Sequence, residues 1–161
     1  MILTAEHVIQ SNWYLITIDD PDFLPSINFI RMIKYIKEMK KFNYVILNDL
    51  EATGRYGLVD SLQKRQNTPI DLNELIEKIV GVKQFEWGDF FLFTDFPKNW
   101  NNSGDGFYPH LIVQSETTLR AIDGQYIYIY TPYKEIVDLV KENYAIESVK
   151  YDVLDNLDYP Y

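Results

Sequence analysis

The chain of 161 residues has no cysteine, only two histidines and no long apolar run. The missing cysteine excludes a disulfide scaffold, a thiolate metal site and a cysteine nucleophile. Two histidines without cysteine do not favour a tetrahedral zinc site either, and we expect no metal and no cofactor. The longest apolar runs, such as residues 90–93, are far shorter than the ~20 residues that a bilayer-spanning helix needs.

The sequence has an excess of acidic residues, with 15 Lys and Arg against 24 Asp and Glu, a formal net charge of −9. This excess argues against direct nucleic-acid binding, because phosphates are met by Lys and Arg. The N-terminus lacks the basic and apolar segments of a secretory signal. We therefore expect a cytoplasmic protein that contacts neither a membrane nor nucleic acid directly.

The acidic charge is concentrated towards the C-terminus. Residues 1–42 carry five bases and five acids, residues 43–100 carry six and nine, and residues 101–161 carry four and ten. The net charges are therefore 0, −3 and −6. This asymmetry is the most informative global feature of the sequence, because it predicts an oriented acidic surface.

Three helices are predicted from apolar periodicity and capping residues. They cover residues 26–41, residues 72–80 and a segment that begins at Thr131-Pro132 and ends near Asn143. Asp71 and Glu74 have the spacing of a capping box at the start of the second helix. Each helix has one apolar stripe, which is typical of a helix that covers a sheet.

Strands are predicted from short apolar runs and alternation. They cover residues 13–18, 44–50, 90–94, 111–114 and 146–153, and a hairpin of residues 117–121 and 125–130 turns at Asp123-Gly124. We expect an α+β fold of residues 1–161 as a single globular domain. Its mixed, mainly antiparallel sheet has two or three helices covering one face. Residues 154–161 form an acidic tail that is either flexible or ordered on a partner.

The first functional hypothesis is a non-enzymatic domain that binds a basic protein. Its size, acidity and lack of cysteine are shared by bacterial immunity proteins and antitoxins, which cover a basic toxin such as a nuclease. The last predicted helix carries acids at spacings of three and four, which is the pattern of either a solvated face or a docking stripe. The expected partner-binding residues are Trp100, Asp105, Glu135, Asp138, Glu142, Asp155 and Asp158, with Trp100 as an exposed aromatic anchor.

The second hypothesis is a small-ligand or carbohydrate-handling protein, which includes the possibility of a hydrolase. Two carboxylates flank a tryptophan, and one histidine follows a proline at a predicted strand start. The four residues are Glu86, Trp87, Asp89 and His110. Paired carboxylates beside aromatic platforms are typical of glycosidases, whereas the chain has no serine nucleophile motif of the G-x-S-x-G kind. This hypothesis predicts a concave site where these groups converge.

Two loops resemble ligand-binding segments only in composition. Residues 51–57 contain two glycines but match no phosphate-binding motif. Residues 95–106 offer Asp and Asn oxygens, yet the twelfth position is Gly106 where a calcium-binding EF-hand loop requires glutamate. Both are predicted as ordinary loops. The oligomeric state and the identity of any partner are left open by the sequence.

Overall fold

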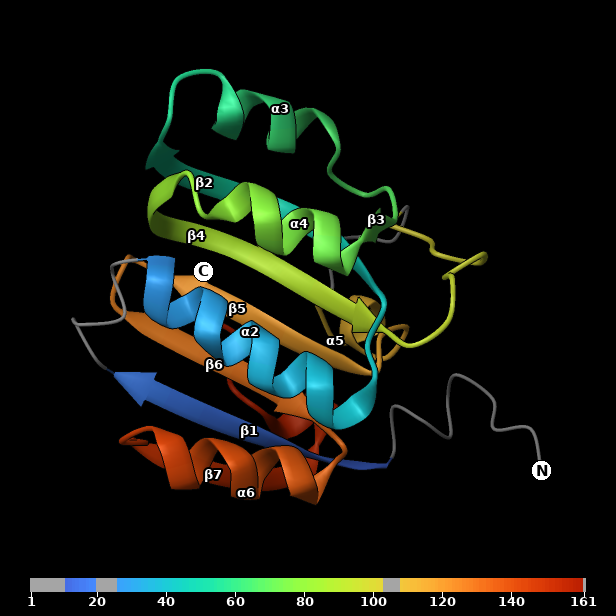
Figure 1. Cartoon of the computed structure of the whole chain (residues 1–161). Coiled ribbons are helices and arrows are strands. Elements are labelled where there is room, and N and C mark those ends of the chain that lie inside the picture. Colours follow the sequence, from blue (N-terminus) through green and yellow to red (C-terminus); the bar gives the residue numbers. More distant parts are fainter. Residues whose placement is uncertain (1–10, 20–25, 103–107, 161) are drawn as a thin grey trace.

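The computed structural model describes residues 11–19, 26–102 and 108–160, and their strands form one sheet (Figure 1). Within these residues the sheet has seven strands in the order β3-β2-β4-β5-β6-β1-β7, and every neighbouring pair is antiparallel. The strands are β1 (Asn12–Asp19), β2 (Tyr44–Gly54), β3 (Ile70–Asp71), β4 (Val82–Phe93), β5 (Thr117–Ile122), β6 (Tyr126–Thr131) and β7 (Ser148–Val153). The α+β prediction is confirmed.

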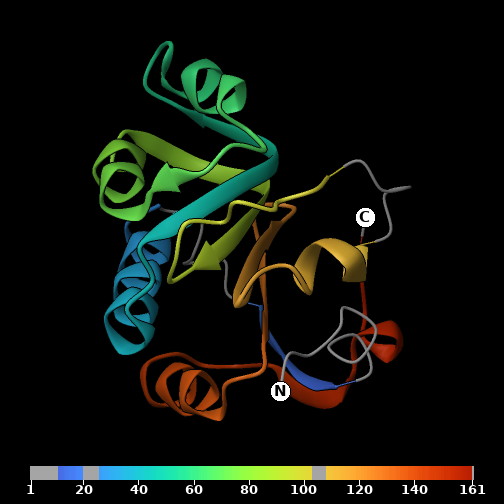
Figure 2. The ribbon, with the colours of Figure 1, turned by 90° about the vertical axis from the view of Figure 1, so that its right-hand side faces the viewer.

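The helices lie on different sides of this sheet. One face is covered by α2 (Ser26–Lys40), α4 (Leu72–Ile79) and α6 (Lys134–Asn143). The opposite face carries α5 (Tyr108–Ile112) and the short 3-10 helix η2 (Leu154–Asn156), as Figure 2 shows, and α3 (Leu58–Lys64) packs against β2. No helix in the described ranges combines the length and apolar character needed to cross a membrane.

The predicted cap of the second helix is present. The Asp71 carboxylate accepts a hydrogen bond from the Glu74 N–H at 3.1 Å, a cap worth about 1 kcal/mol. Helix α2 ends where Lys41 adopts a left-handed backbone (φ 59°). The predicted hairpin turn is also present: Asp123 and Gly124 both have positive φ, as a primed turn requires.

The sheet has a hydrophobic core on each face, whereas the sequence predicted cover on one face only. Ile127 and Ile129 of β6 point into the core beneath α2, α4 and α6. Tyr130 points to the other side, where Trp13 and Phe91 form a second core. The prediction of one covered face is wrong because short segments without helical periodicity, α5 and the residues after β7, supply the second cover.

Residues 111–114, predicted as a strand, instead belong to the end of α5 and the turn after it. This prediction is wrong because a short apolar run does not distinguish a strand from a buried helical turn. Ile112 is fully buried in the second core, and the Val113 N–H donates to the Pro109 carbonyl at 3.0 Å. Helix α3 and strand β3 were not predicted, because each is too short to show a periodic pattern.

Candidate functional site

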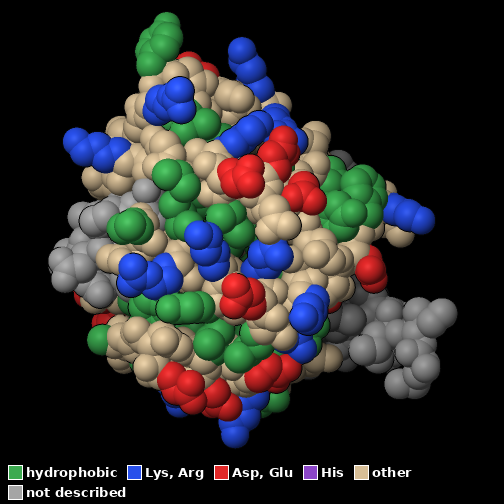
Figure 3. Space-filling view, viewed as in Figure 1, with side chains coloured by type: hydrophobic (Ala, Val, Ile, Leu, Met, Phe, Trp, Pro, Cys, Tyr) green, Lys and Arg blue, Asp and Glu red, His purple; other side chains and the backbone are tan. Residues whose placement is uncertain are grey.

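Helix α6 carries three of the predicted partner-binding acids on its exposed side. Ile136, Val137 and Val140 are buried against the sheet. At 3.6 residues per turn, this burial leaves the carboxylates of Glu135, Asp138 and Glu142 facing outward. Figure 3 shows acidic groups over α6 at the lower edge of this face and basic groups over α2 in its middle.

Two further acids, Asp155 and Asp158, are exposed in the segment after β7, which packs on the sheet face opposite to α6. This segment is packed, which differs from the flexible tail considered from the sequence. Leu154 and Leu157 are buried, and the ring of Tyr159 stacks on Tyr130 with centroids 5.3 Å apart. The acids are therefore held in place up to residue 160.

We name residues 134–160 the acidic end. It comprises α6, β7, η2 and the segments between and after them, and it carries three bases and seven acids, a net charge of −4. Glu135 bonds Lys40 of α2 at 2.8 Å, a contact that lowers the pKa of Glu135, and Asp158 pairs with Lys150. Within the described part of the chain, Asp138, Glu142 and Asp155 form no ion pair.

Trp100 does not lie on the side of the sheet that carries α6. Its ring lies against Phe91 and Phe93, with centroids 4.9 and 6.0 Å away, on the sheet face opposite to α6. Trp100 is half-buried rather than exposed, because the loop after β4 folds its ring onto the second core. Asp105, the remaining predicted partner residue, lies outside the described residues.

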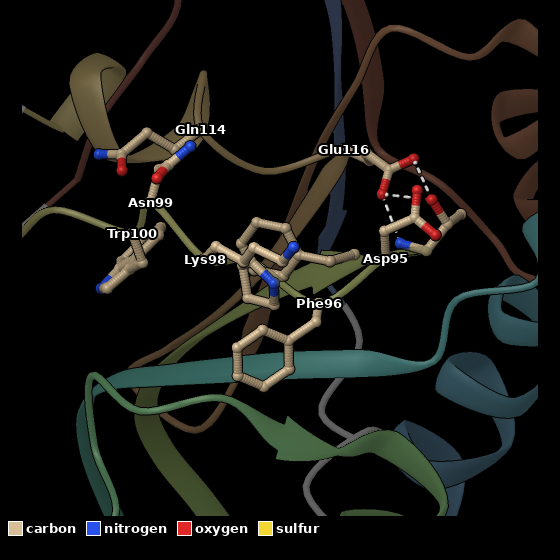
Figure 4. Close-up of a pocket in the computed structure, with 10 residues that line it drawn as sticks. Asp95, Phe96, Lys98, Asn99, Trp100, Gln114 and Glu116 are labelled. Carbon is tan, nitrogen blue, oxygen red and sulfur yellow. Dashed lines mark hydrogen bonds between the residues drawn. The ribbon is translucent and has the colours of Figure 1, made fainter.

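An open pocket of about 500 Å³ lies beside Trp100 (Figure 4). Its walls come from the end of β4, the following loop and residues 114 and 116. Glu116 fixes one wall by accepting hydrogen bonds from the Thr94 N–H and hydroxyl. Phe96 is 52% exposed and meets Tyr44 edge-on at 5.4 Å. The pocket has an aromatic floor, but its two acids, Asp95 and Glu116, stand beside only one base, Lys98.

The four residues of the second hypothesis do not converge. Trp87 and Asp89 lie two residues apart on β4 and point to the same face of the sheet. Glu86 is exposed at a point where β4 has one more residue than β2, and its N-terminal neighbour contacts the other core. His110 is exposed on α5. The structure therefore brings together two of the four.

In place of His110 and Glu86, the sheet sets Arg120 and Tyr128 beside Asp89. The strand register places Asp89, Arg120 and Tyr128 directly opposite one another on β4, β5 and β6. Arg120 Nε lies 3.3 Å from Asp89 Oδ1, and the Arg120 guanidinium lies 5.1 Å from the centre of the Trp87 ring. The Asp89 and Arg120 side chains are 0% and 2% exposed. We name Asp89, Arg120 and Tyr128 the polar row.

Burial dominates the ionisation of this row. Loss of hydration raises the pKa of Asp89 to about 8, although the nearby Arg120 charge acts in the opposite direction. The carboxylate of Asp49 adds a smaller upward contribution. Neither carboxyl oxygen of Asp89 has a hydrogen-bond partner among the described residues. Burial therefore favours the protonated form of the Asp89 carboxyl.

Next to the polar row, β2 contains an extra residue relative to β4, between Asn48 and Glu51. Asp49 lies in this bulge with a φ of 51°. The bulge borders a pocket of about 350 Å³, lined by Asp49, Leu50, Glu51, Gln63, Gln66 and Trp87. No local sequence pattern predicts this bulge, because a bulge arises from the pairing of two distant strands.

Within the described residues, no three His, Asp or Glu side chains gather in a way that could hold a metal ion. Comparison with known proteins gave no match to a family model, to a curated protein or to a solved structure.

Proposed function

We propose that the protein is a binding protein that docks onto a basic partner through its acidic end. One observation supports this proposal above all: Asp138, Glu142 and Asp155 are exposed and form no ion pair within the described residues. Lysines and arginines of a partner would supply the missing counter-charges. Such complementarity speeds encounter and selects partners more than it raises affinity.

More specifically, we propose that the protein is a bacterial immunity protein or antitoxin whose partner is a basic toxin such as a nuclease. The support is the small, acidic, cysteine-free chain together with the position of its acids. The first partners to test are the basic proteins encoded beside this one.

The test is a charge reversal at the acidic end with a matched control. The variant Asp138→Lys, Glu142→Lys, Asp155→Lys changes the net charge by +6. The control Glu38→Lys, Asp60→Lys, Glu77→Lys makes the same change at exposed sites on α2, α3 and α4. We expect the first variant to lose binding to the basic partner in calorimetry, and the control to keep most of it.

Salt gives a second readout. Binding through exposed charges should weaken steadily as salt rises, because the Debye length shrinks to about 10 Å at 0.1 M. If the two triple variants lose affinity equally, or if no basic neighbour binds at low salt, the proposal is wrong.

A second candidate function is small-ligand or carbohydrate binding at the bulge pocket. Trp87 supplies a half-exposed ring there, and Asp49 and Glu51 supply oxygens. We expect saccharides to change the tryptophan fluorescence of the protein and the variant Trp87→Phe to abolish that change. Trp13 and Trp100 remain in the variant as internal controls. An unchanged spectrum up to the solubility limit of the sugars would reject this candidate.

A further inference from the structure

The two ends of the sheet are finished differently. At one end, the short strand β3 pairs with the start of β2, and farther along β2 groups that follow or belong to α3 occupy the outer backbone positions. The Leu50 N–H donates to Gln66 Oε1 at 2.7 Å, and Gln63 Nε2 donates to the Leu50 carbonyl at 2.9 Å. At the other end lies β7, which pairs with β1 on its inner side and with no other strand among the described residues. The outer edge of β7 is thus a strand edge without a described neighbour.

The backbone groups at this edge can be assigned. In antiparallel sheets every second residue bonds to a given neighbour. The Thr17 carbonyl of β1 accepts the Glu147 N–H, and the Val153 N–H turns to the Asp152 carboxylate at 2.7 Å. The Thr17 carbonyl is therefore directed toward β7, and the register pairs Thr17 with Ser148, so Ser148, Lys150 and Asp152 bond to β1. The alternate residues Val149, Tyr151 and Val153 then have their N–H and C=O groups directed outward, which agrees with the side-chain partner of the Val153 N–H.

We propose that the protein forms a two-fold symmetric dimer in which β7 pairs antiparallel with β7 of a second copy, centred on Tyr151. In this register Tyr151 faces Tyr151 of the second copy, and Val149 faces Val153. Lys150 faces Asp152, so two ion pairs form by symmetry. If the register of the two β7 strands shifts by one residue, both ion pairs are lost. If it shifts by two residues, Lys150 faces Lys150 of the second copy or Asp152 faces Asp152 of the second copy. The strand is therefore complementary to itself in one register.

The two faces of β7 agree with this occupant. On the face that carries α6, Tyr151 is 56% exposed, and its ring centroid lies 4.4 Å from that of Tyr14. Tyr151 of the second copy would extend this row of aromatic rings. Helix α6 packs on β1 and β6, so the helical layer leaves β7 accessible. On the other side, Lys150 pairs with Asp158, and Asp152 of the second copy would add a second carboxylate.

Charge complementarity favours a second copy over an arbitrary strand. A lysine and an aspartate on an edge strand discourage pairing with foreign strands, because their charges stay unmatched there. In the two-fold pairing each charge meets its opposite. The dimer and the basic partner use different parts of the acidic end: the dimer uses the outer edge of β7, whereas the partner would contact the exposed acids of α6 and η2.

The absence of cysteine provides a clean cross-linking test. Tyr151→Cys introduces a single thiol on the two-fold axis, where paired Cα atoms lie about 5.5 Å apart, within the range of a disulfide. Ser148→Cys is the matched control on the same strand, because its two copies would lie about 20 Å apart at ~3.4 Å per residue. We expect mild oxidation to give a covalent dimer for the first variant only. Equal cross-linking of both, or none for Tyr151→Cys, overturns the proposal.

Sedimentation of charge variants gives an independent test. Lys150→Asp and Asp152→Lys each turn both interface pairs into like charges, so we expect each variant to raise the dimer dissociation constant at least tenfold. The double variant exchanges the charges and should restore dimerisation to within a few fold. Asp158→Asn removes only the intrachain partner of Lys150 and should leave the dimer intact. A monomeric wild type at every concentration, or a double variant no better than the single ones, contradicts the proposal. Circular dichroism confirms that each variant is folded.

Discussion

Arg120 and Asp89 face each other across β5 and β4, 3.3 Å apart, and both side chains are almost completely buried. Such a pair adds little net stability, because the loss of hydration that disfavours the charged form of Asp89 offsets its attraction to Arg120. Arg120 also lies beside the Trp87 ring and opposite Tyr128 in the strand register.

The stability of the protein should fall as pH rises from about 4 to about 8. The pKa of Asp89 is raised from 3.8 in the unfolded reference to about 8 in the fold. Between these values the folded protein holds a proton that the unfolded chain has lost, so each increase in pH favours unfolding. The slope from this group is at most about 1.4 kcal/mol per pH unit.

Urea denaturation at a series of pH values measures this slope. Asp89→Asn carries no titrating group at this position and should lack the decline between pH 4 and 8. A variant with the same pH profile as the wild type would assign the effect to other residues.

Replacing Asp49 by asparagine should lower the pKa of Asp89. The Asp49 carboxylate raises that pKa through its negative charge, and asparagine keeps the left-handed backbone of the bulge without the charge. We therefore expect the fall in the free energy of unfolding with rising pH to end at a lower pH than in the wild type. Glu51→Gln removes a charge from the same bulge and serves as the control, which should leave the Asp89 titration in place. The carboxyl carbon shift of Asp89 in NMR reports the pKa directly.

Trp100 should contribute to stability rather than act as an exposed anchor. Its ring packs on Phe91 and Phe93, and its Nε1 has no hydrogen-bond partner among the described residues. We expect Trp100→Ala to lower the free energy of unfolding by about 2–3 kcal/mol, somewhat below the cost of a fully buried ring. Trp100→Phe keeps most of the packing and should cost less than half of that. Similar midpoints for Trp100→Ala and the wild type in chemical denaturation would contradict this prediction.

Gly54 should tolerate no side chain. A Cβ atom at this position would lie 2.6 Å from the Gly81 carbonyl oxygen and 2.8 Å from the Val82 Cα, both backbone atoms. We expect Gly54→Ala to destabilise the protein by about 1–3 kcal/mol, as overpacking does. At Gly81 the nearest atom is the mobile end of the Leu58 side chain, so Gly81→Ala should cost less. Thermal unfolding of the two variants side by side tests the ranking, and a larger loss for Gly81→Ala would reverse it.

The elements with long apolar patterns or specific caps could be predicted from the sequence. Helix α4 begins at its Asp71 cap as predicted, because capping and periodicity are local properties. The last predicted helix begins at Lys134, a little later than expected. Thr131 uses its hydroxyl to accept the Tyr133 N–H, and Tyr133 precedes the first helical residue.

The candidate sites depended on information that the sequence does not carry locally. Asp89 was singled out, but its partner Arg120 was not, because only the pairing of β4 with β5 places them together. The residues around Trp100 predict a polar loop, yet the loop folds back and places the Trp100 ring against Phe91. The acids of α6 were placed correctly on an outward face, because a helix with a clear apolar stripe fixes the direction of its other side.

The position of β1 between β6 and β7 has a consequence for the order of folding. β1 precedes every other described strand in the chain, yet its two neighbours in the sheet, β6 and β7, are the last two. A growing chain leaves the ribosome from its N-terminus at about 5–20 residues per second. β1 therefore remains without its native neighbours until β6 and β7 have been synthesised, and this part of the sheet forms last.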